Sequence, residues 1–193
     1  MKRIHLFEFE DFPWFPGWLR VCMTRYIVTV HGLLGTAEKL AQLLARALPH
    51  AAAPRVIDLC SGGGGPMPAV QQILASEHGL GDVSFTLTDL YPNLDAAREI
   101  ARTGTPGLTY RTTPVDATQV ESELVGVRTM VCSLHHMRPQ LARKILVDAQ
   151  SSQQPFCAYE ISDNSPPAWL WWLAIPVNVI VVLLLTPFVR PFR

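Results

Sequence analysis

The amino-acid sequence predicts an α/β protein built on a doubly wound, mostly parallel β-sheet. From residue 55 to residue 161, short apolar runs alternate with segments of helical periodicity, a pattern typical of parallel strands joined by right-handed helical crossovers. Four consecutive glycines follow the first apolar run, where such a sheet turns from strand to helix. With 193 residues, of which 49% are hydrophobic, the chain is long enough for one such domain with a sizeable core.

Charge and cysteine content argue against several classes of function. Lys and Arg together number 16, as do Asp and Glu, so no bulk positive charge predicts a nucleic-acid partner. The four cysteines form no Cys-x-x-Cys pair, which indicates reduced structural thiols in a cytoplasmic domain. The amino terminus lacks the apolar stretch of a secretory signal, so we expect no cleaved leader.

Residues 1–50 are expected to form an aromatic arm followed by helices, which together would act as a lid on a binding site. The arm, within residues 4–18, mixes acids and prolines with six aromatic side chains: Phe7, Phe9, Phe12, Trp14, Phe15 and Trp18. Packing on the domain explains the arm equally well. Leucines and alanines then recur at helical spacing over residues 19–48, where Gly32 and Gly35 are candidates for the boundary between two helices.

Residues 51–163 are expected to form the sheet domain. The predicted strands lie at 55–60, 83–88, 108–113, 127–133 and 155–161. The predicted helices lie at 66–77, 92–103, 117–124 and 138–151. In a doubly wound sheet, ligands bind outside the carboxyl ends of the strands, so functional residues are expected directly after each strand.

The stretch 56–66, Val-Ile-Asp-Leu-Cys-Ser-Gly-Gly-Gly-Gly-Pro, carries the clearest functional signal. Glycines after a buried strand allow the backbone to approach a ligand closely, and Pro66 suits the first turn of the following helix. The loop and the helix start offer free backbone N–H groups and the positive end of a helix dipole. The stretch therefore predicts a site for a nucleotide-type or nucleoside-type ligand.

Two ligand classes fit this loop poorly. The dinucleotide fingerprint Gly-x-Gly-x-x-Gly, laid on Gly62 and Gly64, meets Met67 at its third glycine, and the chain has no Tyr-x-x-x-Lys pair for an NAD-dependent oxidoreductase. The glycine run also lacks the Lys-Ser/Thr of a phosphate-binding P-loop, which disfavours ATP and GTP.

Residues 55–162 resemble the class I S-adenosylmethionine-dependent methyltransferases. In their first motif, an acidic residue on the first strand is followed by glycines at alternating positions. Asp58 occupies the position of the acidic residue, and Gly62 and Gly64 occupy those of the second and third glycines. Cys60 replaces the first glycine. The resemblance implies that S-adenosylmethionine is the cofactor. It also implies that the loop residues Asp58, Cys60, Ser61, Gly62, Gly63 and Gly64 bind it.

The resemblance implies three further points of cofactor contact. Asp89, at the end of the second strand and next to Leu90, would accept both ribose hydroxyls. Asp116 would accept from the adenine amino group, and the Ala117 N–H would donate to the ring. Ser133 follows the fourth strand in Val-Cys-Ser-Leu-His-His-Met. Taken alone, an aspartate after a strand is most often a helix cap, so the interpretation depends on all of these motifs occurring in this order along the chain.

His135 and His136 follow the fourth strand beside the expected methyl donor, which makes them the candidate catalytic residues. A neutral imidazole there would deprotonate an acceptor hydroxyl or amine. The alternative is that one ring packs on the cofactor while the other hydrogen-bonds the backbone. We expect no metal site, because adjacent side chains point apart and no third ligand is evident. Glu160, at the end of the fifth strand, is either an acceptor-facing carboxylate or a satisfied strand-end residue.

Residues 164–193 form a third region, whose first part carries no charge as far as Val189. The apolar segment 168–189 has the length and the flanking aromatic residues of a transmembrane helix. Pro176 and Asn178 near its middle instead suggest a kinked or re-entrant element at a membrane surface. A helix buried in protein is the alternative. On this basis we expect a cytoplasmic, membrane-associated protein.

These features predict a methyltransferase that acts on a small or lipid-like acceptor, with membrane contact through residues 168–189. The alternative is a degenerate, non-catalytic scaffold that keeps the fold and uses its tail for binding. Class I methyltransferases usually add an antiparallel hairpin after the fifth strand, which this sequence lacks. The missing hairpin favours the scaffold, whereas the intact cofactor positions favour the enzyme.

Overall fold

The computed structural model describes residues 14–161 and 167–185. Most of the predicted aromatic arm lies outside this part of the chain, as do both ends of the apolar segment that begins at Asn164. By its internal contacts the chain divides into two units. One unit comprises residues 35–161, and the other combines residues 1–34 with residues 162–193.

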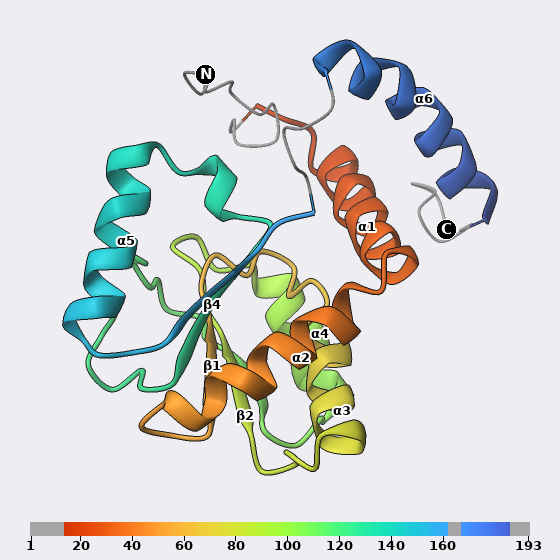
Figure 1. Cartoon of the computed structure of the whole chain (residues 1–193). Helices are drawn as coiled ribbons and strands as arrows, with labels where there is room; N and C mark the ends of the chain where they lie inside the picture. The colour runs from red at the N-terminus through yellow and green to blue at the C-terminus, as the bar shows by residue number, and fades with distance from the viewer. Residues whose placement is uncertain (1–13, 162–166, 186–193) are drawn as a thin grey trace. The chain divides into compact units, whose positions relative to one another are not determined.

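A five-stranded sheet forms the centre of unit 35–161, with the strand order β3-β2-β1-β4-β5 (Figure 1). The strands are β1 (Arg55–Asp58), β2 (Ser84–Leu87), β3 (Leu108–Tyr110), β4 (Val127–Val131) and β5 (Phe156–Tyr159). Every pairing is parallel, which confirms the predicted doubly wound α/β fold. The strand order reverses between β1 and β4, so the carboxyl ends of these two strands flank the crevice where such sheets bind ligands. Within the described residues, no strand follows β5.

Both faces of the sheet are covered, because successive side chains of a strand point to opposite faces. Val56 joins one core with residues of α2, α3 and α4, whereas its neighbour Ile57 joins a second core with Ile145 of α5. Figure 1 shows α5 on one side of the sheet and α2 and α3 on the other. This burial on both faces explains why the strands read as continuous apolar runs rather than as alternating ones.

The helices of this unit agree with the sequence pattern in all but one case. They are α2 (Thr36–Ala47), η2 (Leu48–His50), α3 (Met67–Glu77), α4 (Leu94–Thr103), η3 (Leu134–His136) and α5 (Pro139–Ser151). The predicted helix at 117–124 is wrong, since the residues there form turns. Its apolar spacing is real: Val120 and Leu124 are buried, but they pack from a loop. The Asp116 side chain accepts from the Thr118 N–H and closes an Asx-type turn in place of a helical one.

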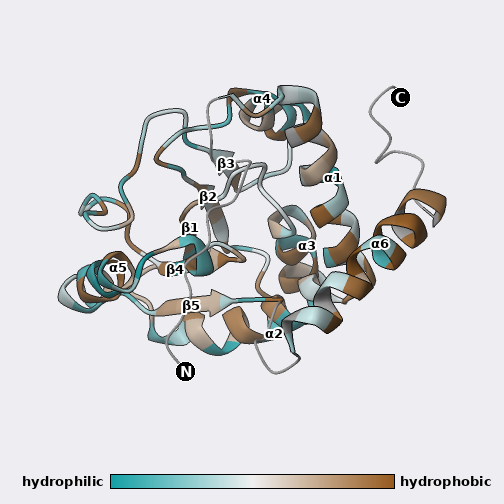
Figure 2. Cartoon of the chain, turned by 90° about the horizontal axis from the view of Figure 1, so that it is seen from above, coloured by the Kyte–Doolittle hydropathy of each residue, from teal (hydrophilic) through white to brown (hydrophobic). Residues whose placement is uncertain are grey.

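Two helices represent the other unit among the described residues, α1 (Gly17–Leu33) and α6 (Ala168–Leu185). The Asn178 Nδ2 atom donates to the Tyr26 hydroxyl at 2.6 Å, which gives the one amide within the apolar helix a polar partner on α1. Figure 2 shows α6 as a largely hydrophobic ribbon. Of its apolar side chains, Trp172 is 76% exposed and Leu184 is 70% exposed.

The predicted transmembrane helix is not supported. None of the helices in the described part of the chain combines the length and the apolar character that crossing a bilayer requires. The predicted re-entrant element is not seen over these residues either, because α6 continues through Pro176.

Candidate functional site

The glycine loop that follows β1 leaves open space above the carboxyl end of the sheet. Gly62 has a φ of +52°, and a Cβ there would meet no atom within 4 Å. Gly64 serves a different purpose: a Cβ there would come within 3.2 Å of Leu87 and 3.3 Å of Ile100. The run of glycines therefore does two things, since Gly64 lets the loop pack onto the sheet and Gly62 leaves room for a ligand.

Asp58 lies beneath this loop and holds it in place. Its carboxylate is 2% exposed and accepts from the Thr129 hydroxyl at 2.7 Å and from the Ser61 hydroxyl at 2.6 Å. Burial raises the pKa of Asp58 to about 6, and the charge of Asp89 adds to the rise, although both hydroxyl donors oppose it. Asp58 thus supports the loop from below with a carboxylate that is buried beneath it.

Ser61 is fixed at three points, which explains why a small polar residue precedes the glycines. Its N–H donates to the Thr88 carbonyl at 2.9 Å, and its hydroxyl oxygen accepts from the Thr88 N–H at 3.1 Å. The same hydroxyl donates to Asp58. The loop is therefore tied to the ends of both β1 and β2 before any ligand binds.

Cys60 adopts the left-handed conformation, with a φ of +56°. A residue with a Cβ is strained in this region of φ/ψ space, and glycine would fit more easily. Burial, followed by the charges of Asp89, Asp58 and Asp116, raises the pKa of the Cys60 thiol to about 12. The thiol is therefore protonated at neutral pH, and Cys60 does not serve as a nucleophile.

Asp89 lies at the end of β2 and joins the glycine loop to the next turn. Its Oδ2 atom accepts from the Gly62 N–H and its Oδ1 atom accepts from the Tyr91 N–H, both at 2.9 Å. Each carboxylate oxygen can accept about two hydrogen bonds, so one acceptor position remains on each oxygen. Two such positions on one carboxylate match the two hydroxyls of a vicinal diol. The neighbouring Leu90 is 43% exposed.

Tyr110 contributes to the site, although no sequence pattern predicted a role for it. From the end of β3, its hydroxyl donates to the Gly62 carbonyl at 2.9 Å and accepts from the Asn93 N–H at 3.1 Å. Together with Asp89, it holds both polar groups of Gly62. The register that pairs Tyr110 with Leu87 of β2 puts the ring at this level, and such a register is not visible in a single sequence.

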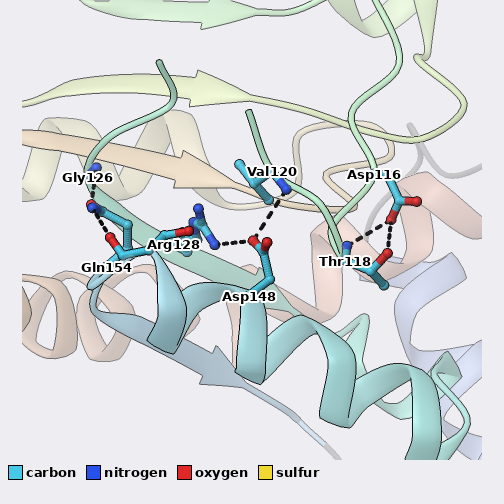
Figure 3. Close-up of polar contacts among 8 residues, drawn as sticks. Asp116, Thr118, Val120, Gly126, Arg128, Asp148 and Gln154 are labelled. Carbon is cyan, nitrogen blue, oxygen red and sulfur yellow. Dashed lines mark hydrogen bonds and ion pairs between the residues drawn. The ribbon is translucent and has the colours of Figure 1, made fainter. Parts of the chain in front are cut away.

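The loop after β3 presents two unused polar groups at the same edge. The Asp116 Oδ1 atom accepts from the Thr118 N–H at 2.8 Å and from its hydroxyl at 2.7 Å (Figure 3). No described residue donates to the other oxygen, Oδ2, or accepts from the Ala117 N–H. An acceptor beside a donor is the pair of groups that the Watson–Crick edge of adenine requires.

Ser133 lies just beyond β4, across the crevice from the glycine loop. Its hydroxyl is buried and has no hydrogen-bond partner in the described part of the protein. Buried polar groups are nearly always paired, so this hydroxyl indicates a missing partner such as a ligand.

His135 and Glu160 form a hydrogen-bonded pair at the ends of β4 and β5. The His135 Nδ1 atom lies 2.7 Å from the Glu160 Oε2 atom. The other carboxylate oxygen accepts from the N–H groups of Leu134 and His135 at 3.0 and 3.3 Å. Glu160 therefore orients the imidazole and favours the tautomer with its proton on Nδ1. In that tautomer, Nε2 is the basic nitrogen.

The expectation that the two histidine side chains point apart is wrong. Their ring centroids are 4.3 Å apart and the ring planes are inclined by 32°. The 3-10 turn Leu134–His136 brings neighbouring side chains together in a way that an extended strand end would not. Among residues 14–161 and 167–185, no group of His, Cys, Asp and Glu has a geometry that could hold a metal ion.

Solved structures with a similar fold were found, whereas no protein-family model and no curated protein matches the chain. They include the trans-methyltransferase CalH in complex with SAH, at 21% identity and a TM-score of 0.45. Another is the mitomycin 7-O-methyltransferase MmcR, at 20% identity and a TM-score of 0.49. A third is a SAM-dependent methyltransferase from Aquifex aeolicus, at 13% identity and a TM-score of 0.40.

These matches cover 62%, 72% and 64% of this chain, respectively. They correspond to 34% of the CalH chain, 40% of the MmcR chain and 70% of the Aquifex protein. All three are described as methyltransferases. At such identities the likeness concerns the fold, and the roles of individual residues rest on the geometry described above.

Proposed function

We propose that this protein binds S-adenosylmethionine at the carboxyl ends of β1, β2 and β3 and transfers its methyl group to a small or lipophilic acceptor. The observation that carries the proposal is the Asp89 carboxylate. It already fixes the glycine loop, yet it keeps one acceptor position on each oxygen for the two hydroxyls of a ribose.

The other unpaired groups support the same ligand. Asp116 Oδ2 and the Ala117 N–H would recognise the adenine edge, and the open backbone at Gly62 would accept the rest of the nucleoside. The buried Ser133 hydroxyl would find its missing partner in the bound cofactor. A nicotinamide dinucleotide is less well matched, because Met67 stands where the dinucleotide fingerprint has its third glycine, which lets the helix pack closely on the strand.

His135 would act as the general base. When bound, the cofactor supplies an electrophilic methyl group on a sulfonium. The Nε2 atom of His135 would take the proton from an acceptor hydroxyl or amine as its oxygen or nitrogen attacks. Glu160, at 2.7 Å from Nδ1, would stabilise the imidazolium that results. His136, whose ring lies against that of His135, would limit the positions the base can adopt.

We extend the proposal to a lipophilic acceptor or a membrane surface on account of α6. Its exposed side chains include Trp169, Trp172 and Leu184, and most soluble domains cover such a surface. Co-sedimentation with phosphatidylcholine and phosphatidylglycerol vesicles tests this part. Recovery of the protein in the supernatant at all lipid concentrations would contradict it.

Catalysis is tested by comparing His135→Asn with the wild type in methyl transfer from labelled S-adenosylmethionine to a panel of phenols and long-chain amines. We expect the variant to lose about 10²–10⁴-fold in kcat, the usual contribution of a general base. Its affinity for S-adenosylhomocysteine should stay unchanged, because the cofactor contacts lie on other residues. Equal rates in both proteins would exclude His135 as the base. Binding without transfer to any acceptor would favour the non-catalytic scaffold.

A further inference from the structure

The loop that carries Asp116 is held by hydrogen bonds at both ends, and Figure 3 shows the one at Val120. At its start, the Val115 N–H donates to the Asp89 carbonyl at 2.9 Å. At its end, the Val120 N–H donates to the Asp148 Oδ2 atom at 3.3 Å. Both valine side chains are buried. The positions of Asp116 and Ala117 therefore depend on how firmly these two ends are held.

Between the two points, the chain makes only local hydrogen bonds. Asp116 accepts from Thr118 through its side chain and from the Gln119 N–H through its carbonyl, at 3.0 Å. These bonds set the shape of the turn but do not attach it to the sheet. Packing does attach it, because the Ala117 side chain is buried in the same core as Ile57 and Met130. Beyond Asp116, the next hydrogen bond to another element is the one that the Val120 N–H donates.

Asp148 can hold Val120 because Arg128 holds Asp148. Arg128 lies on β4 and is 1% exposed, and its Nη1 atom is 2.5 Å from the same Asp148 Oδ2 atom. A buried guanidinium is costly unless it is paired, so this arginine fixes the carboxylate in one position. Asp148 projects from α5 toward the loop, as Figure 3 shows.

We propose that Asp148, fixed by Arg128, is a positioning residue for the adenine subsite: by accepting from the Val120 N–H, it keeps Asp116 and Ala117 in register with the base. The inference rests on the proposed function, since it presumes that Asp116 faces adenine. Asp148 and Arg128 are not among the candidate cofactor contacts, but they would help to determine which nucleoside binds.

The test uses two double variants that differ only in their ability to accept from Val120. Both carry Arg128→Met, which removes the charge that a single substitution at position 148 would leave buried and unpaired. One adds Asp148→Asn, whose amide oxygen can still accept the Val120 N–H. The other adds Asp148→Leu, which cannot. Gln154→Leu is the control, because it removes a similar side-chain bond, to the Gly126 N–H at 2.8 Å, far from the Asp116 turn.

The readout is the ratio of the dissociation constants of S-inosylhomocysteine and S-adenosylhomocysteine, measured by calorimetry. The two ligands differ in the groups that Asp116 and Ala117 would recognise. We expect a preference for the adenine ligand of about tenfold or more in the wild type and the control, and of no more than about threefold in the leucine variant. The asparagine variant keeps the acceptor but loses the arginine that fixes it, so its preference should lie between these two values. A general loss of stability would weaken both ligands alike and leave the ratio unchanged.

Three results would overturn the inference or its premise. The same ratio in the leucine and asparagine variants would show that Val120 needs no acceptor at position 148. Fast hydrogen exchange at the Val120 amide in the wild type would show the same without any variant, so the proposal stays testable if the leucine protein does not fold. Failure of the wild type to bind either ligand would instead contradict the proposed function.

Discussion

Glycines with positive φ occur at both ends of the sheet, but the space around them differs. At the carboxyl end, a Cβ on Gly62 would meet nothing within 4 Å. At the amino end, in the turn before β4, a Cβ on Gly126 would lie 2.3 Å from the Arg55 carbonyl oxygen. The first glycine keeps the chain away from a volume that a ligand can enter. The second lets two segments of the chain fill that volume themselves.

Polar groups follow the same division. At the amino end, the Gly126 N–H is paired with Gln154. At the carboxyl end, the Ser133 hydroxyl has no partner within the described residues, and Asp89 keeps spare acceptor positions. Substitutions at the amino end should therefore change stability alone, whereas substitutions at the carboxyl end should change ligand affinity.

The largest effect is expected for Gly126→Ala. The φ of +149° is open essentially to glycine alone, and the new methyl would overlap the Arg55 backbone, so we expect a loss of about 3–5 kcal/mol in the free energy of unfolding. Urea denaturation followed by circular dichroism measures it. Gly79→Ala is the control, because a Cβ there meets nothing within 4 Å. A similar loss in both variants would mean that the amino end is not tightly packed.

A loss of about 3 kcal/mol is expected from ionisation of Asp58 as the pH rises. Its pKa is 3.8 in a model compound and about 6 in the folded protein, so the folded state binds more protons than the unfolded state between these values. The free energy of unfolding should therefore fall from about pH 4 to pH 6, by about 3 kcal/mol. Asp58→Asn should lack this component. Urea titrations of both proteins across this range would contradict the account if the two curves ran parallel.

A smaller loss, about 1–3 kcal/mol of binding free energy, is expected for Asp89→Ala with S-adenosylhomocysteine, because the ribose loses both acceptors. This corresponds to a rise in Kd of about 5- to 150-fold by calorimetric titration. Asp95→Ala is the matched control, since that aspartate lies in the first turn of α4 and pairs with Arg98. Unchanged affinity in the Asp89 variant would overturn the ribose assignment.

The smallest expected effect is an increase in stability. Cys60→Gly should relieve the strain of a left-handed residue and raise the free energy of unfolding by about 0.5–1 kcal/mol, after allowance for the greater entropy of glycine in the unfolded chain. Thermal unfolding would show it as a higher Tm. A lower Tm would indicate that packing of the thiol outweighs its backbone strain.

The sequence was informative where function depends on residues close together in the chain. Strand–helix alternation predicted the sheet, and the family resemblance singled out Gly62 and Asp89 separately, which are in fact hydrogen-bonded to each other. It was uninformative where two segments meet through strand register, as with Tyr110 and with Arg128 and Asp148. The predicted helix at 117–124 failed because buried residues such as Val120 and Leu124 keep a helical spacing while packing from turns. The predicted transmembrane helix is not found among the described residues.

The most direct test of the central claim is a calorimetric titration of the whole chain, in mild detergent, with S-adenosylhomocysteine and, in parallel, with NAD. We predict micromolar binding of S-adenosylhomocysteine and none of NAD, because the carboxyl end of the sheet offers acceptors for a ribose and an adenine but lacks the third glycine of the dinucleotide fingerprint. Binding of NAD alone, or of neither ligand, would contradict it.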